Sequence, residues 1–180
     1  QQTRGWKRGS ISYAGIYAGG QGLVSSRFRR RPCLTMLELP GQQALSDFRV
    51  AKLTRVLQSV NARVESLQAR YVYFVSTSAK LSREQDSRLD ALLLSGETPL
   101  KLAKGTNHLF VVPRPGTISP WSSKATDIAN ACDIDAVDRI ERGICYAIKF
   151  SSKVSDDDLV AVSAQLFDRM TEAVFTESKG

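Results

Sequence analysis

The chain has 180 residues, of which 42% are hydrophobic and 24% are charged, and its formal net charge at pH 7 is +7. This length suits one domain with or without a tail, and the composition is that of an ordinary globular protein. No apolar run approaches the roughly 20 residues that cross a bilayer, so we expect no membrane partner. Three widely spaced cysteines predict neither a disulfide framework nor a zinc site, and they suit a reducing cytoplasm.

The positive charge is concentrated at the start of the sequence. Residues 1–35 contain seven basic residues and no acidic one, so 25 − 7 = 18 basic residues accompany 18 acidic ones in the remainder. A nucleic-acid-binding domain carries its cations on a folded face, so we expect no nucleic-acid partner. We interpret 1–35 as a basic, disordered leader, translated upstream of an initiator at Met36. An organelle transit peptide is the alternative, because such peptides are also poor in acidic residues and rich in Arg and Ser.

From Met36 onward, strand patterns alternate with helix patterns. A short strand beginning there ends at Pro40, and an amphipathic helix follows it. Segment 70–75 (RYVYFV) is β-branched and aromatic on both faces, as in a central strand. Ser82 and Gln85 form a capping box that opens a second helix. The apolar stripes expected on the two helices are Leu45, Phe48, Leu53, Val56, Leu57 and Val60, and then Leu89, Leu92 and Leu93.

The same order of elements returns in the second half. A strand at 108–112 ends at a proline, and Ser119 is the expected N-cap of a helix with Pro120 in its first turn. Segment 140–150 places apolar residues on one face at a period of two, broken only by Arg142. A second capping box begins at Ser155. The apolar stripe of the last helix is Leu159, Val162, Leu166 and Met170.

Matching residues of the two halves lie 73 positions apart, as in 113 − 40 = 73. The pairs are Pro40 and Pro113, Ser46 and Ser119, Tyr73 and Tyr146, Lys80 and Lys153, and Ser82 and Ser155. We interpret this offset as an internal duplication. The predicted fold is α+β, with pseudo-twofold β-α-β-α units at 36–103 and 104–176 that form one helix-covered sheet. Each unit alone would expose its apolar face, so the two must pack together. A linker begins at 177–180.

The segment RPGTISPWSSKATDIA, residues 114–129, is the most mixed in composition. A helix start presents free N–H groups and a partial positive charge, which suit a phosphate or a carboxylate. The alternative is a capped helix whose Trp fills a core or anchors a domain contact. The first half lacks these polar residues at the matching positions. The candidates for an interface or an anion site are Arg114, Ser119, Trp121, Ser122, Ser123, Lys124 and Thr126.

No residues have the pattern of a catalytic or metal site. His108 and Cys145 lack the glycine-flanked turn of an activated nucleophile, and we expect Cys145 to pack within the sheet. The acidic run at 156–158 lies in the first turn of a predicted helix, which explains it. The acidic residues at 133, 135 and 138 lack the glycine and terminal Glu of a calcium loop. The sequence therefore predicts no catalytic residue, no cofactor-binding residue and no metal ligand.

Residues 114–129, followed by RIERG at 139–143, resemble the N-terminal domain of large-type phosphoribosylformylglycinamidine synthase. The similarity extends to 44–53, 70–75 and 168–175. It implies a fold like a fused dimer of the small subunit of the split enzymes, in agreement with the duplication. It also implies membership of a glutamine amidotransferase and ligase of purine biosynthesis, which makes formylglycinamidine ribonucleotide with ATP and magnesium.

The resemblance further implies the role and the partners of the chain. This domain would dock the synthetase and glutaminase domains of the same polypeptide and support an ammonia channel between them, in the cytoplasm. The catalytic and ATP-binding centres of the family lie beyond residue 180, so residues 1–180 alone are expected to be inactive. Two alternatives remain, namely an independent anion or small-molecule binding module and a basic-tailed nucleic-acid-binding protein.

Overall fold

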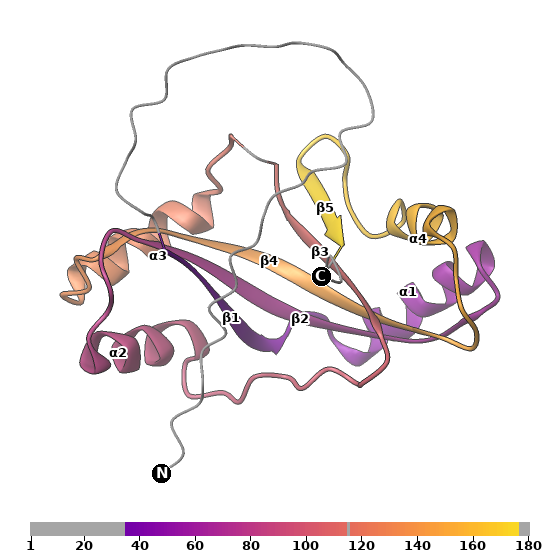
Figure 1. Cartoon of the computed structure of the whole chain (residues 1–180), viewed down its shortest axis with the longest axis horizontal. Helices are drawn as coiled ribbons and strands as arrows, with labels where there is room; N and C mark the ends of the chain where they lie inside the picture. The colour runs from indigo at the N-terminus through magenta and orange to yellow at the C-terminus, as the bar shows by residue number, and fades with distance from the viewer. Residues whose placement is uncertain (1–34, 115, 177–180) are drawn as a thin grey trace.

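The computed structural model describes residues 35–114 and 116–176. Its strands form one antiparallel five-stranded sheet in the order β1-β2-β4-β3-β5, and four helices accompany it (Figure 1), so the fold is α+β as predicted. The leader up to residue 34 and the linker at 177–180 lie outside the described residues. The elements are β1 (Thr35–Gln43), α1 (Asp47–Val60), β2 (Val64–Thr77), α2 (Arg83–Leu94), β3 (Asn107–Pro113), α3 (Pro120–Ala131), β4 (Val137–Phe150), α4 (Asp156–Ser163) and β5 (Glu172–Thr176).

Each helix begins directly after a serine whose hydroxyl oxygen accepts a hydrogen bond from a backbone N–H in the first turn. This bond satisfies one of the N–H groups that a helix start leaves without an intrahelical partner. The capping boxes of α2 and α4 both form, and Pro120 occupies the first position of α3, as the sequence predicts. The capping serines are Ser46, Ser82, Ser119 and Ser155.

The two central strands, β2 and β4, are both 14 residues long and pair with each other along their length. Val72 and Cys145 are each 0% exposed, so these strands are buried on both faces near their middle. This confirms the central-strand interpretation of 70–75 and the packing of Cys145 within the sheet. Both strands extend several residues before the predicted starts at 70 and 140.

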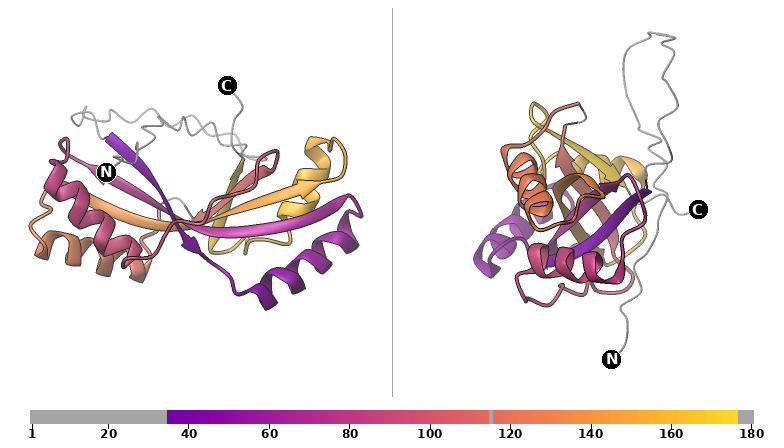
Figure 2. Two further views of the ribbon diagram at one scale, coloured as in Figure 1. Left: turned by 90° about the horizontal axis from the view of Figure 1, so that it is seen from below. Right: turned by 90° about the vertical axis from the view of Figure 1, so that its left-hand side faces the viewer.

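The apolar core consists of two clusters on one face of the sheet, at opposite ends of it. Tyr73 and Val75 of β2 belong to the cluster beneath α2 and α3, whereas Leu67 and Ala69 belong to the cluster beneath α1 and α4. These four residues alternate along the strand and therefore share one face. Figure 2 shows the two helix pairs at the two ends of the twisted sheet. Each pair combines one helix from each half of the sequence, so neither half has a complete core alone.

The structure corrects three expectations. β1 does not end at Pro40 but continues to Gln43 with an irregular register, because an edge strand tolerates a residue without an N–H. α4 ends at Ser163, so Met170 is not part of its stripe and is 78% exposed. The chain turns back after α4 and adds β5 to the edge beside β3, a strand that the sequence analysis missed.

The predicted stripe of α1 is also partly wrong. Leu57 is fully buried, and Leu53 is half-buried, but Phe48 is 77% exposed on the opposite side of the helix. Val56 and Val60 are exposed as well. No helix in the described residues is long and apolar enough to cross a membrane.

Candidate functional site

The start of α3 covers a part of β4 that lacks a neighbouring strand on that side. β3 pairs with β4 only at Ile144–Ile148, so the described residues of β4 before Ile144 have no partner from β3. α3 lies along this edge. The Ser122 hydroxyl donates a hydrogen bond to the Ile140 carbonyl, and the Ile140 N–H donates to Thr126 Oγ1 over 3.0 Å. Two side chains of the helix thus replace the ladder bonds of a missing strand, as buried backbone groups require.

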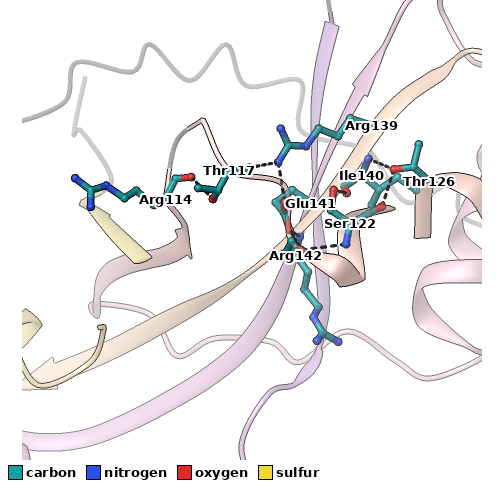
Figure 3. A network of polar contacts seen from close by, with 9 residues as sticks. Arg114, Thr117, Ser122, Thr126, Arg139, Ile140, Glu141 and Arg142 are labelled. Carbon is teal, nitrogen blue, oxygen red and sulfur yellow. Dashed lines mark hydrogen bonds and ion pairs between the residues drawn. The ribbon is translucent and has the colours of Figure 1, made fainter. Parts of the chain in front are cut away.

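This arrangement gives Ser122 and Thr126 a structural role. Ser122 is 1% exposed, and its backbone carbonyl accepts a second hydrogen bond from the Thr126 hydroxyl at 2.8 Å. Both were candidates for an interface or an anion site, but their hydroxyls face β4 rather than solvent (Figure 3). The first half has Arg49 and Leu53 at the matching positions (122 − 73 = 49 and 126 − 73 = 53), so α1 does not hold β2 in this way.

A carboxylate of the chain itself lies at the start of α3. Glu141 Oε1 accepts a hydrogen bond from the Ser119 hydroxyl at 2.8 Å, while the same hydroxyl oxygen accepts the Ser122 N–H at 3.0 Å. Glu141 Oε2 forms an ion pair with Arg139 at 2.8 Å, and Arg139 also donates to the Thr117 carbonyl at 2.9 Å (Figure 3). The Glu141 side chain is only 13% exposed. The capping serine of α3 therefore already has an anionic partner within the domain.

Trp121 is half-buried and belongs to an aromatic cluster on the helix-bearing face of the sheet. Its ring stacks on Tyr73, with centroids 5.8 Å apart and an interplanar angle of 24°. The Arg142 guanidinium carbon lies 4.6 Å from the Trp121 centroid and 4.5 Å from that of Tyr71. The Tyr73 hydroxyl donates to Gln42 Oε1 at 3.0 Å. Burial raises the pKa of Tyr73, while the neighbouring Arg142 charge and the bond to Gln42 offset part of that rise.

Sequence reasoning missed the role of Arg142, although its signal was visible. Arg142 interrupts the apolar alternation of β4 and points to the same face as Ile140 and Ile144. Among the described residues, no carboxylate lies within ion-pair distance of its guanidinium, which contacts two aromatic rings instead. A guanidinium stacked on aromatic faces is well accommodated at a half-buried position because of its planarity and weak hydration.

The remaining candidates are not brought together. Arg114, Ser123 and Lys124 are exposed, and the Arg114 side chain points away from the network around Glu141 (Figure 3). The Arg114 carbonyl accepts hydrogen bonds from the N–H and hydroxyl of Thr117, which closes the turn before α3. The seven candidates thus divide into residues that fix α3 and residues that remain on the surface.

The other residues considered from sequence occupy structural positions. His108 lies on β3, where its ring contacts the Thr106 hydroxyl at 3.1 Å. Cys145 is fully buried within β4. Asp158 caps α4, and hydrogen bonds from Ser155 together with the nearby Arg63 lower its pKa. Within residues 35–114 and 116–176, no three His, Cys, Asp or Glu side chains are grouped so as to hold a metal ion.

The fold and this network define a small α+β domain in which an antiparallel sheet carries a helix pair at each end, with α3 fixed by polar side chains. The family described as formylglycinamide ribonucleotide amidotransferase N-terminal matches residues 70–180. This match covers more than half of the chain, and the chain belongs to that family. The resemblance seen in the sequence is thereby confirmed, and it supports a role in a formylglycinamidine ribonucleotide synthase, an amidotransferase of purine biosynthesis.

Proposed function

We propose that this chain is the non-catalytic N-terminal domain of phosphoribosylformylglycinamidine synthase, which docks the synthetase and glutaminase portions and supports ammonia transfer between them. The observation that carries the proposal is the use of the motif at 114–129. Ser119, Ser122 and Thr126 are engaged in bonds that fix α3 on the sheet, whereas Ser123 and Lys124 remain on its surface. A segment that positions a helix and presents its outer side suits a docking element.

The proposal includes the internal duplication and the likeness to a fused dimer. The bounds of β2 and β4 support it, since 64 + 73 = 137 and 77 + 73 = 150. α1 and α3 begin 73 residues apart (47 + 73 = 120), as do α2 and α4 (83 + 73 = 156). Tyr71 pairs with Ile144 across β2 and β4, and 71 + 73 = 144. A pseudo-twofold axis at this pair would relate the halves and would bring Tyr73 onto Tyr146.

The proposal also assigns the chemistry to other parts of the polypeptide. ATP and magnesium act in the full-length enzyme and are bound outside this domain, and the partners of the domain are the synthetase and glutaminase domains of the same chain in the cytoplasm. Purified residues 1–180 should therefore release no glutamate from glutamine.

The alternative of an independent anion-binding module is disfavoured because the hydroxyl of Ser119, the capping serine of α3, already donates a hydrogen bond to the Glu141 carboxylate. Titration of inorganic phosphate into the purified chain by calorimetry tests that alternative, and saturable binding would support it.

The experiment that tests docking compares glutamine with ammonia as the nitrogen donor. In the full-length enzyme, deletion of residues 36–176 should lower the rate of product formation more with glutamine than with ammonia as the nitrogen donor. Lys124→Ala should raise the number of glutamines hydrolysed per product formed while leaving the melting temperature nearly unchanged, because an exposed cation contributes little to folding. Glutamine-dependent synthesis that survives the deletion with unchanged coupling would refute the docking function.

A further inference from the structure

The outer side of α1 exposes apolar residues that a monomeric domain would ordinarily bury. Phe48 is 77% exposed and Val56 is 38% exposed. Phe48 and Val56 lie eight residues apart, which places them about 80° apart around the helix at roughly 100° per residue. The inner side of the helix is occupied by Leu57 and Leu53, which pack into the sheet cluster. The exposed residues are therefore additional to those that hold the helix in place.

Three cations flank these apolar residues. Arg49, Lys52 and Arg55 are all exposed, and none forms an ion pair within the described residues. The only acidic residue of α1 is Asp47, which accepts a hydrogen bond from Gln43 at 2.8 Å. After residue 35 the sequence has 18 basic and 18 acidic residues, and one of each, Lys179 and Glu177, lies outside the described residues. The described residues therefore carry 18 − 1 = 17 basic and 18 − 1 = 17 acidic side chains, so this positive surface stands out on a neutral domain.

The matching helix of the second half shows that the exposure of Phe48 is not a consequence of its position. Trp121 occupies the equivalent place on α3, since 48 + 73 = 121, and it packs on Tyr73 and Arg142. The exposed side of α3 carries Lys124 and Asp127, one charge of each sign. Among the helices of the described residues, only α1 thus combines an exposed aromatic ring with several cations that form no ion pair. Exposed apolar residues ringed by charge are typical of protein interfaces, and aromatic residues commonly anchor them.

We propose that the outer face of α1, formed by Phe48, Arg49, Lys52, Arg55 and Val56, docks onto an acidic protein surface in the part of the amidotransferase outside residues 1–180. Phe48 inserts into an apolar depression there, and surrounding carboxylates pair with the three cations. This inference rests on the proposed docking function. A protein surface is favoured over nucleic acid because the apolar residues need a depression to fill, and three cations are few for phosphate contacts alone.

Photocross-linking in the full-length enzyme tests this docking face. p-Benzoylphenylalanine replaces Phe48, an exposed position where folding should survive, and circular dichroism of the purified variant checks this. After irradiation, mass spectrometry should locate the cross-link on a peptide beyond residue 180 that lies next to Asp or Glu residues. Adding the double substitution Lys52→Glu/Arg55→Glu to the p-benzoylphenylalanine variant should abolish this cross-link. High salt should also abolish it in the variant that keeps both cations, because screening weakens exposed charge pairs. Lys80→Glu, a charge reversal at an exposed position between β2 and α2, should retain it.

Other results would overturn the docking face. These are the absence of any cross-link, a cross-link only within residues 1–180, a cross-link to a second copy or to nucleic acid, and a cross-link that is insensitive to the charge reversals. The outcome is separable from the coupling experiment above. A domain that couples glutamine hydrolysis to synthesis but shows no cross-link from position 48 would retain its function and dock through another face.

Discussion

The guanidinium carbon of Arg142 lies 4.5 Å from the centroid of the Tyr71 ring, and the same group lies 4.6 Å from that of Trp121. One cation on a central strand is thus held between an aromatic residue of the neighbouring strand and one of α3. Because Trp121 also stacks on Tyr73, the start of α3 is attached to the middle of the sheet by aromatic contacts as well as by hydrogen bonds.

Removal of Arg142 should loosen the start of α3. Arg142→Ala loses two cation–π contacts at a half-buried site and should destabilise the domain by about 1–2 kcal/mol. The stability of Arg142→Lys should lie between that of the parent and that of Arg142→Ala, because an ammonium keeps the charge but not the planar stacking. Urea denaturation measures the stability, and Trp121 fluorescence in a Trp6→Phe background reports the local change. Lys124→Ala is the control, and equal stability of the Lys124 and Arg142 variants would contradict the role of the cluster.

The Glu141 carboxylate should matter more than a surface carboxylate. Glu141→Gln weakens the bonds from Ser119 and Arg139 at a side chain that is 13% exposed, and about 1–3 kcal/mol of stability should be lost. Glu65→Gln is the matched control, because its ion pair with Lys149 is exposed and worth about 0–1 kcal/mol. Chemical denaturation of both variants gives the comparison. Similar losses in the two would show that Glu141 is not the anionic partner that fixes this helix start.

The hydroxyls that face β4 should be distinguishable from their exposed neighbour. Ser122→Ala removes the donor to the buried Ile140 carbonyl and should cost about 1–3 kcal/mol. Thr126→Val leaves the Ile140 N–H without its acceptor and should cost a similar amount, while Thr126→Ser should retain most of the stability. Ser123→Ala, one residue away and exposed, should change it by less than about 0.5 kcal/mol. Thermal unfolding in parallel would reveal whether Ser122 and Ser123 are in fact equivalent.

Asp158 should give the domain part of its acid sensitivity. Hydrogen bonds from Ser155 and the charge of Arg63 lower the pKa of this carboxyl below its ordinary value of 3.8. A lowered folded-state pKa means that the carboxylate stabilises the fold above pH 3.8 and that this contribution disappears as the pH falls through the folded pKa. Asp158→Asn should therefore be less stable than the parent at pH 7, and the difference should shrink below about pH 4.

The test of that pH dependence is urea denaturation between pH 7 and pH 2.5, with Asp157→Asn as the control. Asp157 lies in the same helical turn but is exposed, and no hydrogen bond to its side chain is seen within the described residues. The Asp157 variant should follow the parent across the range. A constant difference between parent and Asp158→Asn at all pH values would mean that the ionised carboxylate is not what stabilises the start of α4.

The sequence by itself determined the local features of this domain and the family to which it belongs. Helix starts were predictable because a capping serine acts within its own first turn, so its signal lies within four residues of sequence. The central strands were recognisable from β-branched and aromatic residues on both faces, as in 70–75. The motif at 114–129 and RIERG at 139–143 identified the family, which the match over residues 70–180 confirms.

Only the tertiary structure decided which residues of different helices and strands come into contact. The sequence did not show that Phe48 of α1 faces outward while Trp121 of α3 packs inward, because helical periodicity is the same whichever side the sheet covers. It did not reveal β5, a short strand whose pairing depends on the edge that β3 leaves open. Nor did it show that Arg142 lies between two rings or that Glu141 meets Ser119, since these contacts join residues of different elements whose proximity the fold alone creates.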